Sequence, residues 1–193
     1  MPLPLVLAGP ILRRADPGRV CIWLATSEKI GVRGEVFADP RGSGSQSQDP
    51  IGTSDPDRGG RETPVRLGDH LFVHLLEVKP PKNGQFPRDT LLGYDVTVET
   101  DNLAGLKLLE GKYSIAYDGL ELPSFFLASE LRTLAHGSCR KPHAGYMEDG
   151  GPTEDRLAVA DRIIAKAPQT LDKRPAIPFL TGDQIYADDV GLP

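Results

Sequence analysis

The sequence predicts two structural parts, a β-sandwich up to about residue 128 and the beginning of an α/β layer after it. Short runs of strand-forming residues separated by turns fill the first part, which is the pattern of an antiparallel sandwich of roughly seven strands. A strand, a helix and a second strand follow, which is the pattern of a β-α-β unit with parallel strands. We therefore place an immunoglobulin-like (fibronectin III-like) domain at 1–128 and an incomplete α/β domain at 129–193.

The strands of the first part are indicated by residue type or by alternation of apolar and polar positions. They are expected at 1–14, 19–27, 30–39, 70–78, 91–100 and 111–119. Trp23 is expected in the core of the sandwich. The stretch 39–64 is rich in Gly, Ser, Asp and Pro, so we expect a long loop with a short edge strand at Ile51.

The second part is expected to contain strands at 131–139 and 176–183 with a helix at 153–168 between them. Thr153 can cap the start of the helix, and Pro168 ends it. One face of this helix is apolar. Its members are Leu157, Ala160, Ile163, Ile164 and Ala167.

Composition and charge exclude several classes of partner. The 22 lysines and arginines against 27 aspartates and glutamates give a net charge of −5 without a basic patch, so no nucleic-acid partner is expected. The apolar start has no basic segment before it and is read as a strand rather than a signal peptide. No apolar run reaches the ~18 residues of a membrane helix, so we expect no membrane partner. Cys21 and Cys139 form no disulfide framework, which favours a reducing, cytoplasmic location.

Three ligand-type side chains follow the two strands of the β-α-β unit. Cys139 ends the first strand, Asp183 ends the second, and Tyr186 follows closely. Parallel strands end at the same edge of a sheet, where ligand sites of α/β proteins form. A thiolate, a carboxylate and a phenolate at one point suit a highly charged transition metal, in particular trivalent iron.

Each of these residues also has an ordinary structural explanation. A cysteine at a strand end is more often a small buried hydrophobe, an aspartate after glycine is more often a turn residue, and a tyrosine is more often half-buried packing. Arg140 can contact a phosphate through two hydrogen bonds, or it is a surface charge. The shared sheet edge is what favours a metal site over these alternatives.

The stretches "AGPILRR", "VCIWLATS", "HGSCR" and "FLTGDQIYADDV" resemble the alkaline phosphatase D (PhoD-like) metallophosphatases. The resemblance covers most of the chain except 39–64. It implies an immunoglobulin-like sandwich followed by a calcineurin-type phosphoesterase domain. It also implies that Cys139 and Tyr186 bind iron (Fe3+), that Asp183 bridges to a second ion such as calcium (Ca2+), and that a water activated on the metals attacks a phosphomonoester or phosphodiester.

One departure from the family pattern concerns the remaining ligands. The family takes an asparagine and several histidines from later strands, and this sequence has no asparagine after Asn102. We therefore expect an N-terminal portion of such an enzyme, inactive or nearly so by itself, with exposed α/β edges that favour self-association. The alternative is a non-catalytic sandwich that binds a partner and carries a relic α/β tail.

Overall fold

The computed structural model describes residues 2–41, 48–111, 114–138 and 156–182. The chain divides into two compact units, Met1–Leu127 and Ala128–Pro193. In the described part of the chain, no helix combines the length and the apolar character that crossing a membrane requires.

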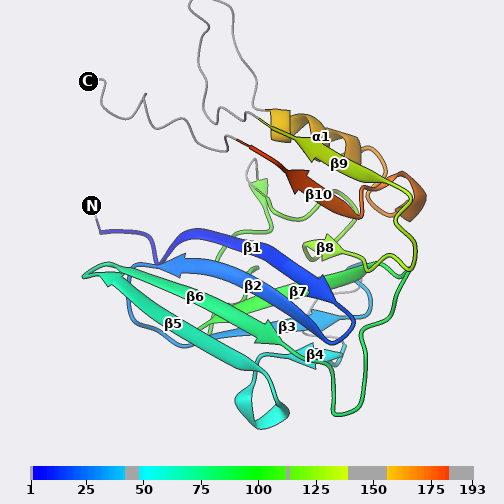
Figure 1. Cartoon of the computed structure of the whole chain (residues 1–193). Helices are drawn as coiled ribbons and strands as arrows, with labels where there is room; N and C mark the ends of the chain where they lie inside the picture. Colours follow the sequence, from blue (N-terminus) through cyan, green and yellow to red (C-terminus); the bar gives the residue numbers. More distant parts are fainter. Residues whose placement is uncertain (1, 42–47, 112–113, 139–155, 183–193) are drawn as a thin grey trace, which may run out of the picture. The chain divides into compact units, whose positions relative to one another are not determined.

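The first unit is a β-sandwich of two antiparallel sheets with four described strands each (Figure 1). Sheet A has the order β1-β2-β6-β5 and sheet B the order β4-β3-β7-β8. The strands of sheet A are β1 (Val6–Asp16), β2 (Arg19–Thr26), β6 (Leu71–Val78) and β5 (Arg61–Gly68). Those of sheet B are β4 (Gly52–Thr53), β3 (Val32–Phe37), β7 (Leu92–Val98) and β8 (Ser124–Phe125). A single 3-10 turn, η2 (Pro56–Arg58), is described before β5.

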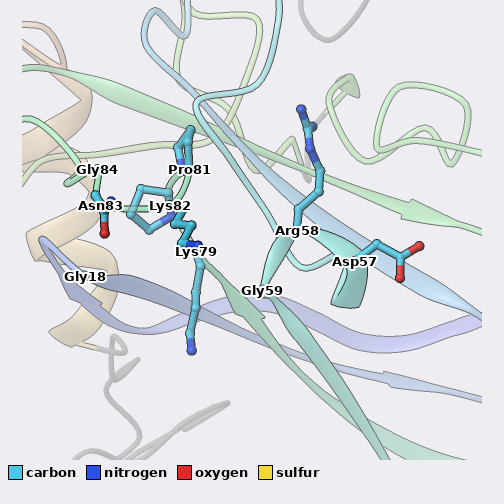
Figure 2. Close-up of a pocket in the computed structure, with 10 residues that line it drawn as sticks. Gly18, Asp57, Arg58, Gly59, Lys79, Pro81, Lys82, Asn83 and Gly84 are labelled. Atoms are coloured by element: carbon cyan, nitrogen blue, oxygen red, sulfur yellow. The ribbon is translucent and has the colours of Figure 1, made fainter.

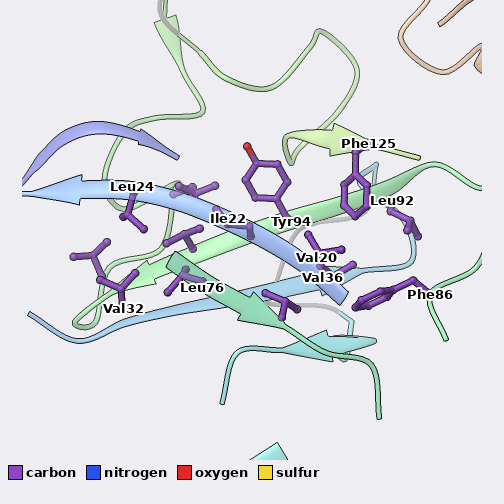
Figure 3. Close-up of a cluster of buried hydrophobic side chains, with 14 of the residues drawn as sticks. Val20, Ile22, Leu24, Val32, Val36, Leu76, Phe86, Leu92, Tyr94 and Phe125 are labelled. Carbon is purple, nitrogen blue, oxygen red and sulfur yellow. The ribbon is translucent and has the colours of Figure 1, made fainter. Parts of the chain in front are cut away.

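The core lies between the two sheets, and β2, β3, β6 and β7 supply most of its buried side chains (Figure 3). Ile22 and Leu76 of sheet A and Val36 of sheet B are fully buried, as expected for strands whose successive side chains point to opposite faces. The two sheets approach each other closely at Gly34, where a Cβ atom would lie 3.0 Å from Val78 Cγ2. The narrow space between the sheets therefore favours glycine at this position.

Both outer strands of sheet A are irregular. The pairing of β1 with β2 shifts register at three points. β5 carries Pro64 within the strand and a register shift near its end. Proline, which cannot donate a ladder hydrogen bond, is tolerated at such an edge position.

Most of the predicted strands of the first part are confirmed, and two predictions are wrong. The loop expected at 39–64 does contain the short edge strand β4, but β5 begins within it at Arg61 because it pairs along the whole of β6. The strand expected at 111–119 is wrong for the described residues 114–119, which form bends and turns. The Ser114 hydroxyl donates to the Ala116 carbonyl and accepts from its amide, a local pattern that competes with strand pairing.

The prediction that Trp23 is buried in the core is also wrong. Val20, Ile22 and Leu24 are the buried residues of β2, so the intervening Trp23 lies on the opposite face and is half-buried. Its cross-strand neighbours there are Ile11 and Leu75. The position of Trp23 in the alternation, not its size, decides its face.

The second unit has two parallel strands, β9 (Leu134–Gly137) and β10 (Ile177–Leu180), separated in sequence by helix α1 (Arg156–Ala165) and the 3-10 turn η4 (Leu171–Lys173). The helix ends before Pro168, as predicted, and Arg174 Nη1 donates to the Pro168 carbonyl at 3.1 Å. Thr153, the predicted cap, lies outside the described residues.

The apolar face predicted for the helix is buried only in part. Ala160, Ile164 and Ala167 are partly buried, but Leu157 and Ile163 are 40% and 52% exposed. All four residues of β10 are exposed as well. A parallel pair is normally covered on both faces, so the described part of this unit leaves apolar surface uncovered.

Candidate functional site

The parallel strands end side by side, and this creates the candidate site. Gly137 is the register partner of Leu180, and the Thr181 amide donates to the Gly137 carbonyl at 3.0 Å. One residue further, a Cβ atom at Gly182 would lie 3.0 Å from Ser138 Oγ. The predicted parallel pairing is confirmed, and the two segments are adjacent up to their last described residues.

The predicted site residues themselves lie outside the described part of the chain. Cys139 and Arg140 follow Ser138 in the sequence, and Asp183 and Tyr186 follow Gly182. The structure shows where the two segments that carry these residues begin. Ser138 and Gly182, which precede them, lie at the same edge of the strand pair. The convergence of the thiolate, carboxylate and phenolate stays a prediction.

A side-chain hydrogen bond joins the two strand ends. His136 Nε2 lies 2.8 Å from Thr181 Oγ1, so the imidazole on β9 holds the residue that follows β10. Both side chains are exposed. No role is predicted for His136 from the sequence, and only the observed register of the pair reveals this contact.

A buried polar cluster in the first unit was also missed. His74 Nε2 lies 2.8 Å from Thr26 Oγ1, and His74 Nδ1 lies 2.8 Å from Glu62 Oε1. Alternation along "HLFVHLLEV" places His74 on the same face as Phe72 and Leu76, and this was the available signal. His74 and Thr26 are fully buried, so this carboxylate–imidazole–hydroxyl series is closed to a substrate.

The described residues that titrate unusually do not form a metal site. Burial raises the pKa of the Cys21 thiol, and the Glu77 carboxylate raises that pKa further, which keeps the thiol protonated. Burial likewise raises the pKa of Tyr94, whose ring packs in the core against Phe125. Within the described ranges, no three His, Cys, Asp or Glu side chains are grouped as metal ligands would be.

One open pocket of about 620 Å³ lies beside the turn after β6 (Figure 2). It is lined by Gly18, Asp57, Arg58, Gly59, Lys79, Pro80, Pro81, Lys82, Asn83 and Gly84. Figure 2 shows Asp57, Arg58 and Lys79 pointing in different directions, and Lys79 Nζ is 3.5 Å from the Glu77 carboxylate. The charged groups therefore do not converge on a common ligand position.

Comparison of the chain with protein-family models, with curated proteins and with solved structures finds no match.

Proposed function

We propose that the second unit contributes to the site of a metal-dependent phosphoesterase of the alkaline phosphatase D type. In this proposal Cys139 and Tyr186 hold Fe3+, Asp183 bridges it to Ca2+ or another divalent ion, and Arg140 contacts the phosphate. The observation that carries it is the adjacency of Ser138 and Gly182, because each precedes one of the two ligand segments directly.

The donor set fits the proposed iron. Thiolate, carboxylate and phenolate are anionic ligands suited to a trivalent ion, and a reducing compartment keeps such a thiolate available. When bound, the two cations supply activation of water and neutralisation of phosphate charge. Among the described residues, His136 and Thr181 tie the two strand ends together, which lowers the entropy lost when the ligand segments meet.

The remaining ligands limit what this chain does alone. After Asn102 the sequence offers no asparagine, so the ligand that the resemblance places in a later strand is missing. We propose that the chain binds one metal ion and hydrolyses phosphoesters slowly or not at all. We also propose that the sandwich is immunoglobulin-like, in keeping with its two four-stranded sheets.

Iron binding gives the most direct test. The full chain is loaded with Fe3+, and metal content and visible absorption are measured. A phenolate–iron bond gives a charge-transfer band, which Tyr186→Phe should abolish and the matched control Tyr117→Phe should leave intact. Cys139→Ser and Asp183→Asn should lower the bound iron. Iron content that is unaffected by all three site variants would refute the proposal.

Activity is measured on an aryl phosphomonoester and an aryl phosphodiester with iron and calcium supplied. We expect turnover far below the ~1 per second of ordinary enzymes. Turnover at or above that scale would show that the chain completes a site on its own, with ligands other than those named here.

A second candidate, a non-catalytic binding module, is favoured by the outer face of sheet A. Ile11 and Leu75 are 44% and 43% exposed, and the half-buried Trp23 lies between them in the register. The solvent face of an antiparallel sheet is normally polar, and exposed apolar patches mark interaction surfaces. Trp23 fluorescence that changes with protein concentration, in a chain that binds no iron, would favour this candidate.

A further inference from the structure

We propose that Glu62, His74 and Thr26 form a proton-operated clamp that holds the edge strand β5 on the sandwich. The three residues lie on β5, β6 and β2, which are consecutive neighbours in sheet A. His74 is at the centre, 2.8 Å from the Glu62 carboxylate on one side and 2.8 Å from the Thr26 hydroxyl on the other. The clamp therefore spans three strands on the inner face of the sheet.

The protonation state follows from counting donors and acceptors. The Thr26 hydroxyl has one proton, which it donates to the Glu28 carbonyl at 2.7 Å. His74 Nε2 must then carry a proton to donate to Thr26 Oγ1. His74 Nδ1 must carry one to donate to the Glu62 carboxylate, which only accepts. All of these hydrogen bonds are made together only when the ring is a doubly protonated imidazolium.

The surroundings leave Glu62 as the counter-charge of that imidazolium. Opposite His74 in the sheet lie Leu24 and Pro64, and the alternate buried residues of β3, which are Val32, Gly34 and Val36, carry no charge. The β4 residues Gly52 and Thr53 also carry no charge. On the same face of β5, the Arg66 side chain is 63% exposed and pairs with Asp69 instead.

The clamp is complete only in an intermediate pH range. As pH falls, protonation of Glu62 removes the negative partner of the imidazolium. As pH rises, loss of the Nε2 proton leaves a lone pair facing the Thr26 oxygen. The Thr26 hydroxyl can then donate either to the Glu28 carbonyl or to His74 Nε2, so one of the two hydrogen bonds is lost. The stability that the clamp gives to strand β5 is therefore lost at low pH and at high pH. The Glu62 side chain is 24% exposed, which gives protons a route to the cluster.

Strand β5 is the element that this change should affect. As an edge strand it pairs only with β6 among the described strands, and the Glu62 side chain attaches it to the interior. Loss of the charge-assisted hydrogen bond should let β5 open more often than the rest of sheet A.

The test is amide hydrogen exchange of the full chain, followed by NMR and expressed as protection factors between about pH 3 and about pH 9, a range wide enough to protonate a carboxyl group at its acid end. Protection of the amides in Arg61–Gly68 should be highest at intermediate pH and fall by about tenfold or more toward both ends. Glu62→Gln should flatten this profile, and Thr26→Val should remove its alkaline side. The matched control Glu77→Gln removes a carboxylate from the outer face of β6 and should keep the bell shape.

A direct reading of the ring keeps the proposal falsifiable even where a variant folds poorly. Long-range 15N–1H spectra of the unmodified chain distinguish the imidazolium from either neutral tautomer, and the His74 signals are assigned by their absence in His74→Gln. We expect the imidazolium at intermediate pH. A neutral ring protonated only at Nδ1 throughout, or a profile for Glu62→Gln identical to that for Glu77→Gln, would overturn the proposal.

Discussion

Gly34 offers the sharpest test of how the sandwich packs. A Cβ atom at this position of β3 would lie 3.0 Å from Val78 Cγ2 and 3.1 Å from Leu76 Cδ1. Apolar carbons pack best at about 3.5–4.0 Å, so Gly34→Ala forces its neighbours to move by a few tenths of an ångström. Val78 and Leu76 are fully buried, and a close-packed interior has little space to receive them.

The expected magnitude follows from two opposing effects. Overpacking costs about 1–3 kcal/mol, whereas replacing glycine by alanine within a strand contributes roughly 0.5–1 kcal/mol of stability. Gly34→Ala should therefore lower the free energy of unfolding by about 1–2 kcal/mol, which corresponds to a fall in Tm of roughly 3–8 °C. Urea unfolding and a thermal scan, both followed by circular dichroism, measure the two quantities.

Gly31→Ala is the matched control, because a Cβ atom there meets nothing within 4 Å. This change should leave the free energy of unfolding unchanged or raise it slightly. The double variant Gly34→Ala/Val78→Ala should cost less than the sum of its two single changes, since the smaller residue at 78 receives the added methyl group. A Tm of Gly34→Ala equal to that of the unmodified chain, or strictly additive free energies, would refute the packing argument.

Three further predictions concern polar groups. Asp95 is buried and accepts hydrogen bonds from two backbone amides, so Asp95→Ala should cost roughly 2–3 kcal/mol of unfolding free energy in urea; a loss below the error of the measurement would contradict this. Because burial and then Glu77 raise the pKa of Cys21, Glu77→Gln should lower that pKa and speed alkylation of Cys21 at mildly alkaline pH, as read by peptide mass spectrometry; an unchanged rate would exclude the Glu77 effect. Because the side chains of His136 and Thr181 are in contact and hold the strand ends together, His136→Ala should raise the rate of hydrogen exchange at the Thr181 amide. An unaltered exchange rate would count against this role of His136.

The sequence predicted the regular strands well because their burial alternates. Val32, Gly34 and Val36 face the core in turn, and the intervening Arg33 and Glu35 face outward. Trp23 was misplaced because its size was weighed above its position in the same alternation. Where local pattern and residue preference agree, the prediction and the structure agree.

The errors in the first unit arose where tertiary pairing or local bonding decides the conformation. The β5 sequence "RETPVRLG" combines proline with charged residues and looks like a loop. Its strand conformation comes from antiparallel pairing with β6, the next strand along the chain, and from the contact of Glu62 with His74. Conversely, the alternation around Ile115 suggested a strand, but the hydrogen bonds of Ser114 within the turn prevail.

For the candidate site, the sequence predicted the geometry of the strands but not the contacts between them. The order strand–helix–strand is enough to predict parallel pairing and a shared edge, and β9 and β10 pair in this way. The hydrogen bond from His136 to Thr181 depends on the register of that pair. Register is set by packing, which a single sequence does not reveal.

The irregular outer strands of sheet A have a consequence for behaviour at high concentration. Pro64 in β5 and the shifted pairing of β1 interrupt the row of backbone groups that could template strand addition by another molecule. Strand β10 contains a proline as well, because Pro178 is its second residue and cannot donate a ladder hydrogen bond. Strand addition at these edges should therefore be slow, and Pro64→Val should speed aggregation of the chain at high concentration.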